Sequence, residues 1–126
     1  MQKIINGSDF RKMVNIGAGL LQQNKKMVDA LNVFPVPDGD TGTNMYLTIK
    51  SAVAEVNKVM DNDLPALAEA LSRGALRGAR GNSGVITSQI LKGFCSAFGQ
   101  NKEINTKQFA KALQEGANIA YKAVTM

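Results

Sequence analysis

The sequence predicts an all-α protein of about five or six amphipathic helices. Three observations lead to this prediction. Apolar residues recur at helical spacing along most of the chain, no alternating strand pattern of useful length is present, and only 6% of the 126 residues are aromatic. Because 44% of the residues are hydrophobic and 20% are charged, the chain can bury one ordinary core, and we expect a single domain over residues 1–126.

The first predicted helical stretch begins near Ser8, a residue type that favours the N-cap position. Its apolar positions continue through a second short piece to Leu31, and the stretch ends before Pro35. A helical pattern restarts at Thr43 and closes at the polar turn 61–63. The first two helices are therefore expected to flank a proline-containing loop.

Pro65 marks the start of the next predicted helix, because proline is favoured at the first helical position. A glycine-containing loop at 78–84 separates it from a further helix. Asn105 and Gln108 are spaced as in a capping box and predict the start of the last helix. That helix has no stop signal and its apolar stripe is still in phase at Val124, so we expect a C-terminally truncated domain.

Composition removes several function classes. Histidine is absent, which excludes histidine general bases, imidazole triads and histidine zinc sites. The single cysteine, Cys95, has apolar neighbours, so we expect a small core residue. The net charge of +5 suits an anionic ligand, but Lys and Arg are scattered and Trp is absent, which argues against nucleic acid. Because no apolar run could span a membrane and no signal peptide is evident, we expect a cytoplasmic protein.

The segment 32–44 is the most informative part of the sequence. Its prolines stiffen the backbone that leads into Asp38, and an extended chain places Asp38 and Asp40 on the same side, about 6 to 7 Å apart. Two carboxylates that close repel each other unless a cation lies between them. Oxygen ligands without Cys or His favour Mg²⁺ or Ca²⁺, and the calcium-loop pattern fails because Thr43 and Ile49 stand where it requires Gly and Glu.

Glycines and polar residues complete this segment. Gly39 and Gly42 allow close approach of the backbone to a ligand. The oxygens and amides of Thr41, Thr43 and Asn44 lie at a helix start, where anions bind. An Asx-rich turn that caps a helix accounts for the same residues equally well from their spacing alone. Both interpretations stay open at this point.

The second glycine-containing loop, 78–84, carries Arg80, Asn82 and Ser83 directly before a predicted helix. Its backbone N–H groups and its hydroxyl are suited to phosphate oxygens. No Gly-Lys-Ser/Thr follows the glycines, so this is not a Walker A loop. Taken alone, a flexible connection between helices is the simpler interpretation.

Two stretches, NVFPVPDGDTGTNM at 32–45 and GARGNSGVI at 78–86, together closely resemble the N-terminal, ATP-binding domain of bacterial fatty acid kinase. That domain is similar to the nucleotide-binding L subunit of dihydroxyacetone kinase. The resemblance extends over essentially the whole chain, including 104–105 and 121–124. It implies a dihydroxyacetone kinase L-subunit-like nucleotide-binding domain over residues 1–126.

The resemblance implies an antiparallel up-and-down helical barrel of about eight helices, of which this chain would hold about five or six. ATP or ADP and a pair of Mg²⁺ ions are implied at one end. Relatives carry a third aspartate where this chain has Asn32, which is therefore a candidate third ligand, while Arg80 either adds charge or forms an ion pair. By position, the metal-holding catalytic residues are Asp38 and Asp40, and the nucleotide-binding residues are Thr41, Thr43, Asn44, Gly81, Asn82, Ser83 and Gly84.

The implied reaction transfers the γ-phosphoryl group of ATP to a fatty acid carboxylate that a separate lipid-binding protein presents, giving an acyl phosphate. A carboxylate is already anionic at neutral pH, so the acceptor needs no general base and the absence of histidine is no obstacle. A truncated barrel can be inactive alone or form a homodimer by exchanging helices. The alternatives are the nucleotide-binding part of a dihydroxyacetone kinase and, from another class, a non-catalytic nucleotide-binding, metal-binding or interaction module.

Overall fold

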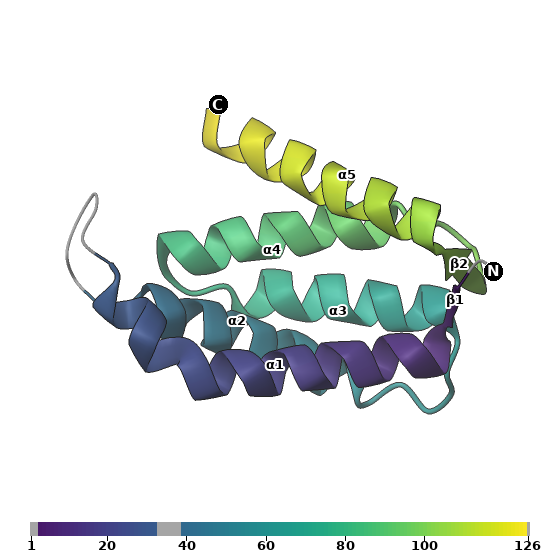
Figure 1. The fold of residues 1–126 in the computed structure, drawn as a ribbon, viewed down its shortest axis with the longest axis horizontal. Coiled ribbons are helices and arrows are strands. Elements are labelled where there is room, and N and C mark those ends of the chain that lie inside the picture. Colours follow the sequence, from purple (N-terminus) through teal and green to yellow (C-terminus); the bar gives the residue numbers. More distant parts are fainter. Residues whose placement is uncertain (1–2, 33–38, 126) are drawn as a thin grey trace.

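The computed structural model describes residues 3–32 and 39–125. Within those ranges it contains five helices and a two-stranded ribbon, so the predicted all-α class is confirmed. In chain order, as drawn in Figure 1, the elements are β1 (Ile4–Asn6), α1 (Gly7–Ala30), α2 (Thr41–Val56), α3 (Leu64–Gly78), α4 (Gly81–Ser96), β2 (Glu103–Asn105) and α5 (Thr106–Thr125).

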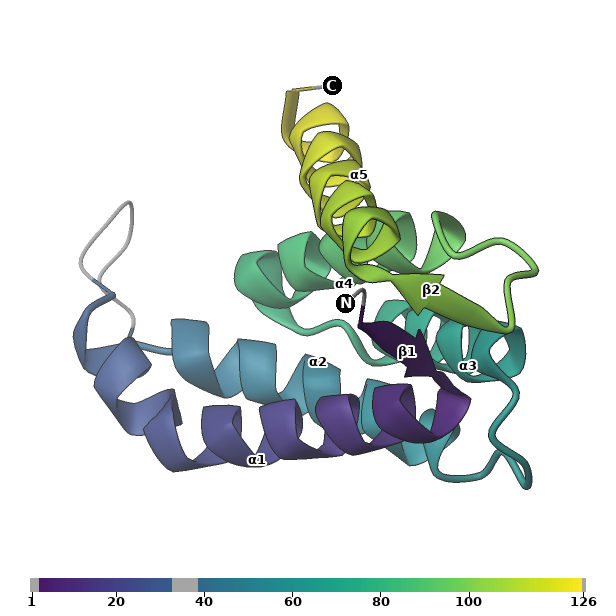
Figure 2. The same cartoon turned by 45° about the vertical axis from the view of Figure 1, so that its right-hand side comes forward.

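The helices run up and down, each antiparallel to the one before it (Figure 1). As a result, the N-terminal ends of α2 and α4 lie at the same end of the bundle as the C-terminal ends of α1 and α3. The β1–β2 ribbon lies at the opposite end, where it joins the starts of α1 and α5 (Figure 2). This alternation is what brings two helix N-termini together, and the candidate site is found there.

The start of α1 differs from the sequence prediction. Asn6, not Ser8, is the N-cap, and it forms a capping box with Asp9 in which both backbone-to-side-chain hydrogen bonds measure 3.0 Å. From there α1 continues unbroken to Ala30, so the expected division into a long and a short piece is wrong. The helix begins after Asn6 because the capping box satisfies two backbone N–H groups at once, which a single serine side chain does not.

Two other helix starts follow the sequence closely. Asp63 caps α3 by accepting from the N–H of Ala66 at 3.2 Å, and Pro65 follows one residue into the helix, where no backbone hydrogen bond is lost. The predicted capping box of Asn105 and Gln108 is confirmed, with hydrogen bonds of 2.8 and 2.9 Å. Local side-chain chemistry therefore sets these boundaries.

The β1–β2 ribbon is not predicted from the sequence. Each strand has three residues, and Ile5 pairs with Ile104 in antiparallel register. A segment this short is below the length at which alternation can be recognised. Since Ile104 is 1% exposed, the ribbon also contributes to the core.

Aromatic rings fill the core at the ribbon end of the bundle. Phe98, which is 1% exposed, packs edge-to-face against Phe10 and Phe94 with ring centroids 5.5 and 4.9 Å apart. Phe94 continues the cluster to Phe109 on α5. Cys95 is buried beside them, as predicted, and burial raises the pKa of its thiol to about 12.

Arg11 fastens α1 to the connection between α2 and α3. Its guanidinium donates to the carbonyls of Val56, Val59 and Asp61 at 2.7 to 3.1 Å and to the Asn62 side chain at 2.8 Å. Arginine suits this role because its planar group offers five donors in a fixed geometry. This loop is therefore held by one side chain from a distant part of the sequence.

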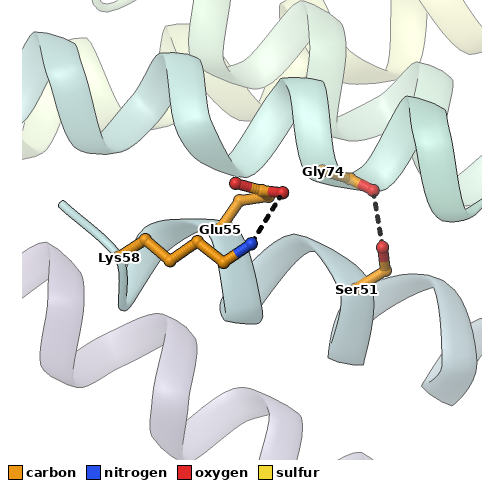
Figure 3. A network of polar contacts seen from close by, with 4 residues as sticks. All are labelled: Ser51, Glu55, Lys58 and Gly74. Carbon is orange, nitrogen blue, oxygen red and sulfur yellow. Dashed lines mark hydrogen bonds and ion pairs between the residues drawn. The ribbon is translucent and has the colours of Figure 1, made fainter.

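Helices α2 and α3 approach each other closely because α3 carries glycine at the crossing. A Cβ on Gly74 would lie 2.8 Å from the Ala52 Cα atom, and the Ser51 hydroxyl donates to the Gly74 carbonyl at 3.0 Å (Figure 3). Figure 3 also shows the ion pair of Lys58 with Glu55, at 3.5 Å, in which the Lys58 side chain is largely exposed. This pair joins residues three apart in the chain, whereas the packing at Gly74 sets the distance between α2 and α3.

No helix in residues 3–32 and 39–125 has the length and apolarity that a membrane crossing requires.

Several large apolar side chains are exposed along one stripe of α1. Within the described part of α1 only Gly7 and Phe10 are fully buried. The exposed members of the stripe are Met13, Ile16, Leu20 and Met27, followed by Leu31 just after the helix.

Replacing Phe98 by alanine tests the aromatic core. We expect Phe98→Ala to lower the free energy of unfolding by about 3 to 5 kcal/mol, because the cavity removes contacts with two rings. Phe109→Ala, at a partly buried ring with one such contact, should cost clearly less. Urea denaturation followed by circular dichroism measures both, and an equal loss for the two variants would contradict this assignment of the core.

Candidate functional site

The first turns of α2 and α4 lie against each other at the end of the bundle opposite the ribbon (Figure 1). The Ser83 hydroxyl donates to the Thr41 carbonyl at 3.3 Å. The buried Thr48 hydroxyl donates to the Asn44 carbonyl at 2.8 Å and accepts from the Arg80 N–H at 3.2 Å. These hydrogen bonds join the two sequence stretches that resemble a nucleotide-binding domain.

Two glycines make this contact between α2 and α4 sterically feasible. Gly81 has a φ of +66°, and a Cβ there would lie 2.5 Å from the Asn44 Nδ2 atom. A Cβ on Gly84 would lie 2.4 Å from the Thr48 Oγ1 atom. The segment 81–84, predicted as a loop, is in fact the first turn of α4, because glycine at the positive-φ start lets the helix begin directly after Arg80.

The aspartate-containing segment is described only in part. Asp38 and the preceding residues 33–37 lie outside the described residues, so the prediction for Asp38 stays a prediction. Asp40 is exposed at the N-cap of α2, and its carboxylate makes no hydrogen bond to the helix that follows. Its N–H donates to the Asn32 Oδ1 atom at 3.3 Å, so Asn32, the candidate third ligand, fastens the end of this segment.

The two helix starts at this site differ from the other three. In α1, α3 and α5, the side chain of the N-cap residue accepts a hydrogen bond from a backbone N–H of the first turn. Neither Asp40 on α2 nor Arg80 on α4 makes such a side-chain cap. Gly81 and Asn82 are exposed at the start of α4. Uncapped N–H groups at the positive end of a helix dipole attract anions, so this end of α4 is suited to phosphate oxygens.

Asp29, near the end of α1, is a site residue that the sequence pattern does not identify. Its carboxylate accepts from the Thr43 N–H at 2.9 Å and from the Thr43 hydroxyl at 2.6 Å. The hydroxyl hydrogen bond, followed by that of the N–H, lowers the pKa of Asp29 below its ordinary value of 3.8. Asp29 therefore caps α2 from a neighbouring helix.

The signal for Asp29 in the sequence is weak. A carboxylate in the last turn of a helix is disfavoured by the helix dipole, and α1 has no basic residue there to offset it. Such a residue is expected to have a partner elsewhere. Which partner it has depends on how the chain turns between α1 and α2, and that turn is not encoded in residue spacing.

Close contact between α1 and α2 accompanies the Asp29 hydrogen bonds. A Cβ on Gly42 would lie 2.3 Å from the Lys25 carbonyl oxygen and 2.9 Å from the Val28 Cβ atom. The Lys25 ammonium also lies 4.7 Å from the centre of the Tyr46 ring, a cation–π contact across the same two helices. Gly42 is thus required for packing.

The structure brings together most of the predicted site residues. Asp40 stands at the edge of the same region. In the described part of the chain, no group of three or more acidic or cysteine side chains is placed to hold a metal ion. The residues that form the first turns of α2 and α4 are Thr41, Thr43, Asn44, Gly81, Asn82, Ser83 and Gly84, and of these Thr43 is hydrogen-bonded to Asp29 of α1.

Comparison with known proteins places residues 35–126 in the DAK2 domain family. Protein YloV of Bacillus subtilis (strain 168) is 52% identical over 122 residues, which cover 97% of this chain and 22% of YloV. Uncharacterized proteins of Staphylococcus epidermidis (strain ATCC 12228) and Staphylococcus aureus (strain USA300) are 52% and 50% identical over 120 residues, with 95% of this chain and 22% of theirs covered. The chain thus spans 22% of the length of these relatives.

Gly42→Ala tests whether close packing holds the start of α2 in place. We expect a loss of about 1 to 3 kcal/mol in the free energy of unfolding, because the new methyl group collides with the α1 backbone. Gly17→Ala is the matched control within a helix, since a Cβ there meets nothing within 4 Å. It should raise the free energy of unfolding by about 0.5 to 1 kcal/mol. Similar effects for both variants in urea denaturation would rule out the packing role.

Asp29→Asn tests the charge of the cap by its pH dependence. A lowered pKa in the folded state means that the ionised carboxylate stabilises the fold above the unfolded value of 3.8, and that this stability is lost as the pH falls through the folded value. We therefore expect the variant to melt at a lower temperature than the original chain at pH 7, with the difference shrinking towards pH 3. Asp63, whose pKa Lys102 lowers by a hydrogen bond, remains in both proteins and contributes a common acid sensitivity. A difference in melting temperature that does not change with pH would contradict the prediction.

Proposed function

The chain belongs to the DAK2 domain family of kinase domains, and from this premise we propose that it is the Mg-ATP-binding part of a phosphotransferase. The proposed acceptor is a fatty acid carboxylate presented by a separate lipid-binding protein. The family itself supports a dihydroxyacetone kinase-like nucleotide-binding module. The acceptor rests on the resemblance of the two motif stretches to fatty acid kinase.

One observation carries the proposal for the nucleotide. The first turns of α2 and α4 meet, and this contact brings Asn44, Ser83 and the exposed residues Gly81 and Asn82 to the helix start that Asp40 precedes. Donors on one side and a carboxylate on the other are what a metal–phosphate complex requires. A simple Asx turn would account for Asp40 but not for a second, uncapped helix start packed against it.

The donor set fits Mg²⁺. Asp40 offers a carboxylate that is exposed and forms no cap with α2, and hard oxygen ligands are the ones that Mg²⁺ binds. Asp38, two residues earlier, is the proposed second ligand. Bound Mg²⁺ supplies neutralisation of charge on the phosphoryl oxygens. The protein's own contribution is to hold the phosphates in line at the start of α4, where the helix dipole and Arg80 favour negative charge.

The proposed chemistry needs no proton transfer by the protein. A carboxylate oxygen of the acceptor forms a bond to the γ-phosphorus as the bond to the bridging oxygen breaks, giving an acyl phosphate and ADP. The acceptor is ionised at neutral pH, so catalysis depends on positioning and charge neutralisation. This agrees with a chain that contains no histidine.

Calorimetric titration with Mg·ADP tests the proposed nucleotide site. We expect Asp40→Ala to weaken binding roughly tenfold or more, because it removes a charged ligand, while the melting temperature changes little, because Asp40 makes no cap. Asp61→Ala, at an exposed aspartate in the turn at the other end of α2, should bind as the original chain does. Binding that needs neither Mg²⁺ nor Asp40 would count against the proposal.

The acceptor is tested separately with a protein of the length of the relatives that contains this chain. Phosphoryl transfer that depends on a fatty-acid-binding protein would support the proposed substrate. Transfer that depends instead on a ketose-binding protein would identify a dihydroxyacetone kinase, and nucleotide binding without turnover with either would leave a non-catalytic binding module.

A further inference from the structure

A groove of about 590 Å³ lies between α3 and α4. Its lining residues come from α3, from α4 and from the turn that follows α4. On α3 they extend from Pro65 to Arg77, which is about 18 Å at the helical rise of about 1.5 Å per residue. Among the described residues, none in the first turns of α2 and α4 lines this groove, so it is separate from the candidate site.

The groove concentrates positive charge. It is lined by three cations, Arg73, Arg77 and Lys92, and by one carboxylate, that of Glu69. Three positive charges less one negative leave +2 in the groove, out of +5 for the whole chain. A smaller pocket between α1 and α2 has a single cation, Lys50, in its lining. An acidic ligand is therefore the chemistry that complements the groove between α3 and α4.

The cations of the groove are available to a ligand. The side chains of Arg77 and Lys92 make no hydrogen bond or ion pair with the part of the chain that the structure describes. Arg73 pairs with Glu69 at 3.6 Å, but the Glu69 side chain is 78% exposed, and such a pair contributes little. Arg77 also lies in the last turn of α3, where the helix dipole favours a cation. That role does not account for Lys92, because the last turn of α4 contains no basic residue.

An exposed leucine lies between the two arginines. Leu76 is 43% exposed and lines the groove, three residues after Arg73 and one before Arg77 on the same helix. Ala68 and Cys95 are buried and add a small, uncharged surface to the lining. The groove thus offers an apolar contact among cations. This arrangement is complementary to a segment that carries carboxylates around an apolar side chain.

The spacing of the arginines favours a helix of an acidic protein over other anions. Arg73 and Arg77 are four residues apart, which is also the spacing at which a helix presents two carboxylates on one face. A guanidinium binds a carboxylate through two parallel hydrogen bonds. Among the described residues, no aromatic side chain lines the groove, whereas a site for single-stranded nucleic acid would offer rings for stacking. A length of about 18 Å also exceeds what one inorganic anion can contact.

We propose that the groove between α3 and α4 is a docking site for an acidic amphipathic helix of a partner protein. Carboxylates four residues apart on that helix pair with Arg73 and Arg77, and its apolar side chain packs on Leu76. A further carboxylate meets Lys92 on the α4 side of the groove. The proposal does not depend on the proposed function, because the groove and the nucleotide site share no described residue.

A synthetic peptide of about 15 residues, long enough to form a helix, serves as the probe. It carries Glu at four-residue spacing and Leu on the same face, its ends are blocked, and a fluorophore reports binding by anisotropy. A second peptide has the same composition in an order that scatters Glu and Leu around the helix. We expect the original chain to bind the first peptide at least about tenfold more tightly than the second. The affinity should fall as salt is added, because exposed charge pairs are screened.

Arg77→Gln combined with Lys92→Gln tests the position of the docking site. Because neither side chain has a partner to lose and glutamine favours helix, we expect the double variant to stay folded and to bind the peptide about tenfold more weakly. The matched control is Lys107→Gln combined with Lys111→Gln, which removes the same charge from two exposed lysines of α5. It should bind as the original chain does. An equal loss in both double variants would reveal a general effect of net charge and overturn the proposal.

Two further measurements separate docking in the groove from attraction of charge alone. Leu76→Ala keeps every charge, and we expect it to weaken peptide binding several-fold at high salt as well as at low salt. In the ¹⁵N-labelled original chain, the peptide should shift the amides of Ser72, Leu76 and Ser96 and leave those of Gly81 and Asn82 unchanged. Shifts confined to Gly81 and Asn82 would place the peptide outside the groove and contradict the proposal.

Other occupants give different outcomes. Displacement of the peptide by an equal concentration of a single-stranded oligonucleotide would assign the groove to nucleic acid, and displacement by inorganic pyrophosphate would assign it to small anions. Either result would overturn the proposal, as would equal affinity for the two peptides or no binding at about 1 mM. Titration with Mg·ADP has no part in these measurements, so the docking site and the proposed function can fail separately.

Discussion

The two hydrogen bonds between Asp29 and Thr43 are the interaction on which the rest of the site depends. They fix the end of α1 to the start of α2, at the point where Gly42 allows the two backbones to touch. Once α2 is placed, its Thr48 hydroxyl accepts from the Arg80 N–H and its Thr41 carbonyl accepts from the Ser83 hydroxyl. The position of the first turn of α4 therefore depends on the position of α2.

Alternation of helix direction gives this end of the bundle its electrostatic character. The positive ends of α2 and α4 lie beside the negative ends of α1 and α3, so each dipole is partly compensated by a neighbour (Figure 1). At α2 the compensation is completed by the Asp29 carboxylate. At α4 no side-chain cap is made, and the N-cap residue is the cationic Arg80.

Much of the fold can be predicted from the sequence, because helical spacing and local caps act within a few residues. The starts at Asp63 and Asn105 follow from such local chemistry, whereas the approach of the two polar, glycine-containing segments was expected only from the family resemblance. The wrong or missing predictions concern distant partners and short elements. A start at Ser8 overlooks the capping box that Asn6 forms with Asp9, the ribbon is too short to show alternation, and Asp29 acquires its role only through Thr43.

The distribution of burial along α1 separates stability from the site. Near its start, α1 is held by the buried Phe10 and by Arg11, which donates to the α2–α3 connection. At its last turns, Met27 and Leu31 are 59% and 71% exposed, so little apolar burial holds that end. The end of α1 is instead held by the Asp29 hydrogen bonds and by contact with Gly42. Loss of these polar contacts should therefore release the last turns of α1 locally, while the aromatic core at the ribbon end stays folded. The candidate site therefore lies at the end of the bundle where polar contacts hold α1. A change in those contacts should alter the geometry of the site while the aromatic core stays folded.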